Sequence, residues 1–134
     1  MRTFFALKTK MPYDSHVLEH MKKTATELLC DVEGDAHTQA IVLYSATGNT
    51  YGTVVKDACS REMTEEKSML AGLRAAGDTQ IRYLLCMWLD GGVDIPSLAF
   101  RRMTVELDPQ NAAALLLVMT AEGTSAISVG ETMK

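Results

Sequence analysis

The sequence has few cysteines, no long apolar run and no excess of positive charge, and each absence excludes a class of protein. Its three cysteines, Cys30, Cys59 and Cys86, show no CxxC spacing, which favours a reducing compartment over a disulfide framework. No stretch approaches the roughly 18 apolar residues of a membrane span, and the opening MRTFFALKTK does not resemble a signal peptide. The net charge of −4 argues against a nucleic-acid partner. We therefore expect a cytoplasmic protein that binds neither membranes nor nucleic acids.

The composition is that of a globular domain. The 134 residues are 47% hydrophobic and 22% charged, which is enough apolar material for a packed core and too little charge for a disordered chain. No linker, repeat or low-complexity segment divides the sequence. We expect a single domain over residues 1–134.

Apolar periodicity predicts alternating strands and helices. Strands are expected over residues 3–10, 40–45, 51–56, 81–89, 112–119 and 126–129. Helices are expected from Asp14 or Ser15 to Gly34, from Thr64 to Gly77, and from Asp94 or Pro96 to Asp108. The order β-α-β-β-α-β-α-β-β predicts an α/β fold, a three-layer αβα sandwich with a mixed central sheet.

Three local segments match the motif order of a known family. Residues 52–58, GTVVKDA, stand where small cytidine deaminases often have Gly-x-Asn-x-Glu-Asn-Ala. Thr64-Glu65-Glu66 stands where Cys-Ala-Glu opens a helix, and Pro96-Ser97-Leu98-Ala99-Phe100-Arg101 stands where Pro-Cys-Gly-Ala-Cys-Arg opens the next. From Asp14 to Lys134 the chain resembles this family, which implies the family's fold and an oligomer, with a second copy or a related chain as partner.

The resemblance also shows what this chain lacks. The family's zinc ligands are replaced by Thr64, Ser97 and Phe100. Neutral hydroxyls bind zinc poorly and phenylalanine does not bind it at all. We therefore expect no zinc and no other cofactor.

Some side chains of the matched segments remain candidates for a residual site. Glu66 matches the family's general acid/base glutamate, and its alternative role is a first-turn residue favoured by the helix dipole. Thr64 and Ser97 are candidates to bind water or a small anion at two helix N-termini, or are simple N-caps. Arg101 and Asp57 are further candidate ligand-binding residues.

Two other motifs point to different chemistry. The segment 16–20, HVLEH, matches the HxxEH pattern of zinc peptidases, but its side chains are expected to face solvent. The segment 45–50, SATGNT, resembles the phosphate loop of flavodoxins, or is a plain hairpin turn. Cys59 is expected to be a small buried residue near a strand end, and Cys86 and Trp88 are expected in the core.

These observations give one leading hypothesis and two alternatives. The leading one is a non-catalytic cytidine deaminase-like domain that acts as a structural, assembly or ligand-sensing subunit. The first alternative is a metal-independent enzyme, or a protein that binds nucleosides or nucleotides, which uses the pocket around Glu66. The second is a flavin-binding protein that uses the SATGNT loop.

Overall fold

The computed structural model of the chain describes residues 12–133, so the strand expected over residues 3–10 lies outside the described residues. The helices are α1 (Ser15–Leu29), α2 (Thr64–Ala75) and α3 (Leu98–Leu107), with short 3₁₀ helices η1 (Pro109–Ala113) and η2 (Gly130–Met133). The strands are β1 (Gln39–Ser45), β2 (Thr50–Val55), β3 (Ile81–Trp88), β4 (Val93–Asp94), β5 (Leu115–Thr120) and β6 (Gly123–Ser128). Within residues 12–133 no helix has the length and apolar character needed to cross a membrane.

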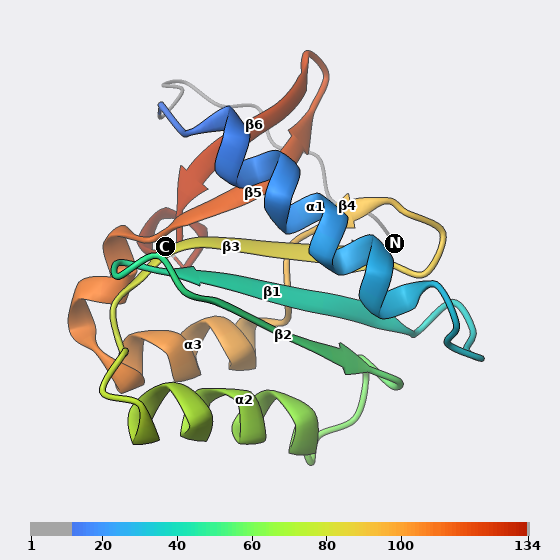
Figure 1. Cartoon of the computed structure of the whole chain (residues 1–134), viewed down its shortest axis with the longest axis horizontal. Coiled ribbons are helices and arrows are strands. Elements are labelled where there is room, and N and C mark those ends of the chain that lie inside the picture. Colours follow the sequence, from blue (N-terminus) through green and yellow to red (C-terminus); the bar gives the residue numbers. More distant parts are fainter. Residues whose placement is uncertain (1–11, 134) are drawn as a thin grey trace.

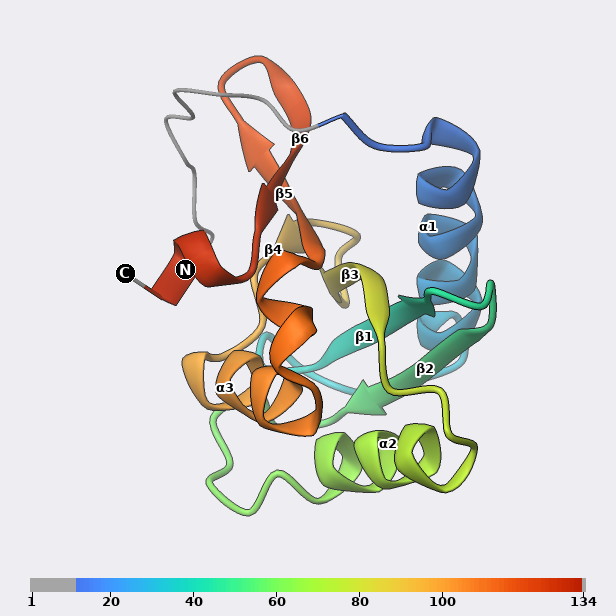
Figure 2. The same cartoon turned by 90° about the vertical axis from the view of Figure 1, so that its left-hand side faces the viewer.

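The strands form one mixed sheet between two helical layers. The strand order is β2-β1-β3-β5-β6, and β4 pairs with β3. β3 and β5 are parallel, and the other pairs are antiparallel. Figure 1 shows α1 across one face of the sheet and α2 and α3 against the other face, and Figure 2 shows the same layers after a quarter turn. The predicted three-layer α/β fold with a mixed sheet is confirmed.

The two-residue period of the strands explains the two cores. On β1, Ala40 and Val42 pack with the buried face of α1, whereas Ile41 and Leu43 pack with residues of α2 and α3. On β3, the run from Tyr83 to Met87 is buried throughout, because helices cover both faces of this strand. The prediction of a strand buried on both faces is confirmed.

The predicted end of the first helix at Gly34 is wrong. α1 begins after Asp14, whose side chain accepts hydrogen bonds from the backbone N–H groups of His16 and Val17, but it already ends at Leu29. Gly34 instead lies tightly against Thr38, since a Cβ atom on Gly34 would stand 2.3 Å from the Thr38 hydroxyl oxygen. The glycine is required by this close approach and not by a helix C-cap.

The starts of the other two helices differ in how they are capped. α2 begins at Thr64 as predicted, but the N-cap residue is Met63, in a left-handed conformation with φ of 53° and no capping side chain. The simple N-cap role expected for Thr64 is therefore wrong. Ser97 does cap α3, because its Oγ accepts the N–H of Phe100 at 3.1 Å. α3 begins later than predicted, since Asp94 is paired with Cys86 in β4.

Candidate functional site

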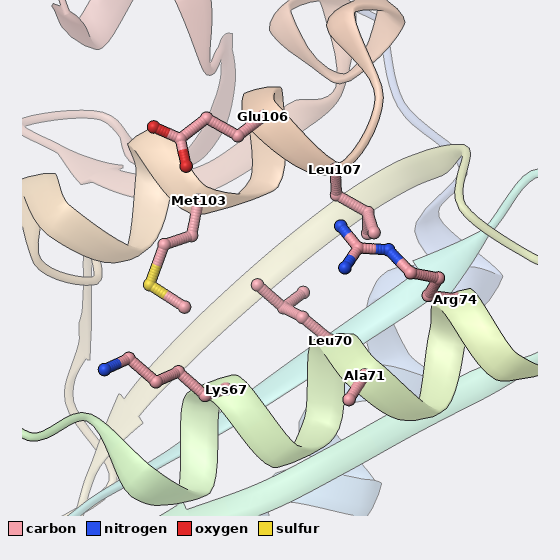
Figure 3. A pocket seen from close by; sticks show the side chains of 7 residues that line it. All are labelled: Lys67, Leu70, Ala71, Arg74, Met103, Glu106 and Leu107. Atoms are coloured by element: carbon pink, nitrogen blue, oxygen red, sulfur yellow. The ribbon is translucent and has the colours of Figure 1, made fainter.

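The two helix starts that carry the matched segments lie at the same end of the molecule. Figure 3 shows Lys67 opposite Met103 and Arg74 opposite Leu107. α2 and α3 therefore run side by side in the same direction, and Figure 1 shows both beginning on the same side. We therefore look for a candidate site around the residues that begin these helices, including Thr64.

The three positions matched to zinc ligands do not offer a zinc site. Thr64 and Ser97 are exposed, and the Ser97 hydroxyl oxygen already accepts a backbone hydrogen bond. Phe100 is fully buried, and its phenyl ring has no lone pair to donate. Within the described part of the chain, no group of three or more His, Cys, Asp or Glu side chains is arranged to hold a metal ion. These residues do not fit a zinc ion.

Among the residues of the matched segments, Glu66 has a buried carboxyl group. Its side chain is only 4% exposed, and its Oε1 atom has no hydrogen-bond partner among the described residues. Burial raises the pKa of the Glu66 carboxyl group, and the hydrogen bond from its own backbone N–H offsets part of this effect. A buried carboxyl without a full set of partners lowers the stability of the fold, and such groups are concentrated at functional sites.

Three other polar side chains share the interior with Glu66, and we name the four residues Gln39, Glu66, Cys86 and Asp94 the polar centre. The Cys86 thiol contacts Gln39 Oε1, and Asp94 stands opposite Cys86 in the β3–β4 pair. Burial raises the pKa of the Cys86 thiol, and the negative charges of Asp94 and Glu66 raise it further. The thiol is therefore protonated at neutral pH, and it interacts electrostatically with both carboxyl groups.

The sequence did not reveal the polar centre beyond Glu66. It placed Cys86 and Trp88 in an ordinary core and Asp94 at a helix start. Cys86 is buried as expected. Trp88 is only half-buried, so its expected place in the core is wrong, and its Nε1 donates to Asp94 Oδ2 at 3.0 Å, which holds this carboxylate inside the fold.

Arg101 and Asp57 do not join the polar centre through any hydrogen bond seen in the described chain. Arg101 is 8% exposed, and it donates from Nε to the Pro96 carbonyl at 3.1 Å and from Nη1 to the Thr132 carbonyl at 2.9 Å. Asp57 is exposed, and its Oδ1 accepts the N–H of Cys59 at 2.9 Å. Both side chains have internal partners, and their ligand-binding roles stay predictions.

Thr64 lines an open groove between β2 and α2. The groove has a volume of about 450 Å³. Its lining residues are Tyr51, Gly52, Thr53, Thr64, Glu65, Ser68, Met69 and Gly72. Glu66 is not among its lining residues, so the polar centre and this groove are separate features.

A second groove runs between α2 and α3. Its volume is about 230 Å³, and Figure 3 shows how the side chains are arranged around it. On α2 the charged Lys67 and Arg74 flank the apolar Leu70 and Ala71, and α3 contributes Met103, Glu106 and Leu107. This groove carries no residue of the three matched zinc positions.

The SATGNT loop is a hairpin turn whose polar groups bind a carboxylate of the chain itself. Asp78 accepts hydrogen bonds from the Thr47 hydroxyl at 2.9 Å, the Asn49 amide at 3.1 Å and the Tyr51 hydroxyl at 2.8 Å. Burial alone would raise the pKa of this carboxyl group, but hydrogen bonds from Asn49, Tyr51, Ser45 and Thr47 lower it to about 2. The side-chain donors of Thr47 and Asn49 are therefore already used by Asp78, and the backbone N–H groups of Ala46, Gly48 and Asn49 donate to Gln80 and Ser45.

We predict that Asp78 makes the protein sensitive to acid. Because the pKa of its carboxyl group falls from 3.8 to about 2 on folding, the carboxylate contributes stability above pH 4, which is lost as pH falls towards 2. Asp78→Asn is expected to lower the free energy of unfolding at neutral pH by about 2 kcal/mol and to flatten its dependence on pH in this range. Urea unfolding at several pH values measures both effects.

Glu106→Gln is the matched control, since Glu106 is exposed and the substitution removes the same single charge. It should leave the acid dependence unchanged. An Asp78→Asn variant that loses stability on acidification as steeply as the parent protein would contradict the prediction.

The remaining motif residues lie on the surface. His16, Glu19 and His20 of the HVLEH segment are exposed, as the sequence predicts, and His20 Nε2 lies 2.9 Å from the Thr50 hydroxyl oxygen. Cys59 is also exposed, so its expected burial is wrong. Its place in the loop between β2 and α2 keeps it out of the core.

Comparison with known proteins supports the fold and leaves the activity open. No family model and no curated protein matches the sequence. Among solved structures, cytidine deaminase from Mycobacterium leprae is similar with a TM-score of 0.63 and 16% identity, over 87% of this chain and 96% of that one. Cytidine deaminase from Burkholderia pseudomallei has a TM-score of 0.62 and 14% identity, over 84% of this chain and 93% of that one. Cytidine deaminase from Mycobacterium tuberculosis has a TM-score of 0.62 and 13% identity, over 86% of this chain and 92% of that one. The chain therefore has the cytidine deaminase fold.

Proposed function

We propose that this chain is a non-catalytic cytidine deaminase-like domain that acts as a structural, assembly or ligand-sensing subunit in the cytoplasm. The observation that carries the proposal is Phe100. This side chain is fully buried at the position matched to a zinc ligand, and it packs in the core formed with α2 and α3. Deaminases of this kind need a metal to produce hydroxide near neutral pH, and the residues here do not supply its ligands.

Two grooves on the surface support a binding role for the chain. The groove beside Thr64 is lined by several residues with hydroxyl groups and has a volume of about 450 Å³, which is within the range of small-molecule sites. The groove between α2 and α3 combines apolar side chains with the charged Lys67, Arg74 and Glu106. We propose a small polar ligand for the first groove, and a second copy or a related chain as the assembly partner.

The proposal predicts the outcome of zinc loading. Purified protein incubated with excess zinc and then dialysed should retain no stoichiometric metal, and it should not convert cytidine to uridine in a spectrophotometric assay. Metal content is measured by mass spectrometry of the digested protein. One retained equivalent of zinc together with cytidine turnover would overturn the proposal.

A control variant tests whether the three positions are matched correctly. Thr64→Cys, Ser97→Cys and Phe100→Cys together place three thiols at these positions, and thiolates are strong zinc ligands. If the positions converge, the triple variant should retain about one zinc per chain under conditions in which the parent protein retains none. A folded triple variant without zinc would show that the positions do not converge.

Metal-independent chemistry at Glu66 is a second candidate function. It is favoured by the partnerless Oε1 atom and by the raised pKa of this carboxyl group, since a carboxyl of this kind suits general acid or base catalysis. Glu66→Gln keeps the shape of the side chain and removes its titration. If the variant equals the parent in every nucleoside-binding and turnover assay, this candidate is eliminated.

A further inference from the structure

Two tripeptides of similar sequence face each other at one end of the β1–β2 hairpin. Asp35-Ala36-His37 precedes β1, and Asp57-Ala58-Cys59 follows β2. Because the strands are antiparallel, with Gln39 opposite Val55, the two tripeptides lie at the same end of the sheet, as Figure 1 shows for the loops that carry them. The backbone N–H of Ala58 donates to the carbonyl of His37 at 2.9 Å, which joins the two loops directly.

This arrangement brings a thiol and an imidazole into contact. Cys59 Sγ lies 3.6 Å from His37 Nδ1, and both residues are exposed. Each loop is held by its own aspartate: Asp35 Oδ1 accepts the N–H of His37 at 2.8 Å, and Asp57 Oδ1 accepts the N–H of Cys59 at 2.9 Å. Hydrogen bonds therefore hold the backbones of both residues, and both residues are exposed to solvent.

We propose that Cys59 and His37 form a nucleophile–base pair that carries out thiol–disulfide exchange with small disulfides. His37 Nδ1 takes the thiol proton, and the Cys59 sulfur attacks one sulfur of the disulfide. The disulfide S–S bond breaks as a new S–S bond to Cys59 forms. The departing thiolate takes the proton from the imidazolium, so that Cys59 is oxidised and the leaving thiol is reduced.

The surrounding backbone favours sulfur chemistry over acyl transfer. Acyl transfer passes through an oxyanion that needs free N–H donors beside the nucleophile. Here the N–H groups of Ala58, Cys59 and Ser60 donate to the His37 carbonyl, to Asp57 Oδ1 and to the Asp57 carbonyl respectively. Attack on a disulfide creates no oxyanion, so it needs none of these donors.

The other two cysteines provide an internal comparison. The negative charge of Asp31 raises the pKa of the exposed Cys30 thiol, which reduces its thiolate fraction. Burial raises the pKa of the Cys86 thiol and also blocks access to it. Cys59 is the cysteine that combines exposure with contact to a base.

The test uses an aromatic disulfide that releases an absorbing thione, and oxidised glutathione as an aliphatic disulfide. The full chain is kept in a chelator so that bound metal does not mask the thiols. Peptide mass spectrometry assigns each adduct to a cysteine. At neutral pH, Cys59 should react at least about tenfold faster than Cys30, and His37→Gln should slow Cys59 about tenfold without changing the rate at Cys30.

The controls separate this proposal from general surface effects and from the proposed function. His16→Gln changes another exposed histidine and should leave all rates unchanged, and circular dichroism confirms the fold of each variant. Equal rates at Cys30 and Cys59, or an unchanged Cys59 rate in the folded His37→Gln variant, would overturn the proposal. Zinc and cytidine do not enter these measurements, so their outcome is independent of the zinc-loading experiment.

Discussion

Phe100→Ala is expected to lower the free energy of unfolding by about 4 kcal/mol. The side chain is fully buried near the start of α3, in the core that also contains Met63, Leu70 and Cys86. Removing its ring leaves a cavity that the surrounding strands and helices fill only in part. Urea denaturation gives the change as a shift of the unfolding midpoint at constant slope.

Two variants calibrate this result. Leu98→Ala removes an apolar side chain of the same helix that is 39% exposed, and it should cost less than about 1 kcal/mol. Phe100→Leu keeps most of the volume and should lie between the two. A loss below about 1 kcal/mol in Phe100→Ala would mean that the ring does not fill the core.

The fold was largely predictable because its main signals are local. The apolar run in β3 and the spacing of Leu18, Met21 and Ala25 in α1 report burial without knowledge of the tertiary structure. The misassigned end of the first helix depends on a tertiary contact, since only the fold brings Thr38 against Gly34. β4 was missed for the same reason, because two residues become a strand only by pairing with β3.

The candidate site was predictable only where the family resemblance identified a residue. Glu66 was found in this way, but the contact between Gln39 and Cys86 joins residues 47 positions apart and leaves no pattern in the sequence. The SATGNT loop shows a related limit. Its hydroxyl and amide groups resemble a phosphate loop, yet the sequence does not show that Thr47 and Asn49 donate to Asp78 of the same chain.

Asn111→Ala is expected to lower the free energy of unfolding by about 3 kcal/mol. Asn111 is fully buried and connects three parts of the main chain. Its Oδ1 accepts the N–H of Ile81 at 2.8 Å, and its Nδ2 donates to the carbonyls of Thr79 and Thr104 at 2.9 Å each. Alanine leaves the N–H of Ile81 and the carbonyl of Thr79 without this partner, and the Thr104 carbonyl keeps only the N–H of Asp108 at 3.3 Å. Each buried group that is left unsatisfied costs about 1–3 kcal/mol.

Asn111→Asp distinguishes hydrogen bonding from packing, because it keeps the size of the side chain. The carboxylate still accepts from Ile81 but donates to neither carbonyl, so this variant should be at least as unstable as Asn111→Ala at neutral pH. Acidification should restore part of the loss, since a protonated carboxyl group donates one hydrogen bond. The exposed neighbour Gln110 is the control, and Gln110→Ala should change stability by less than about 0.5 kcal/mol. If Asn111→Asp were as stable as the parent protein at neutral pH, the two donated bonds would not hold the end of α3 against the start of β3.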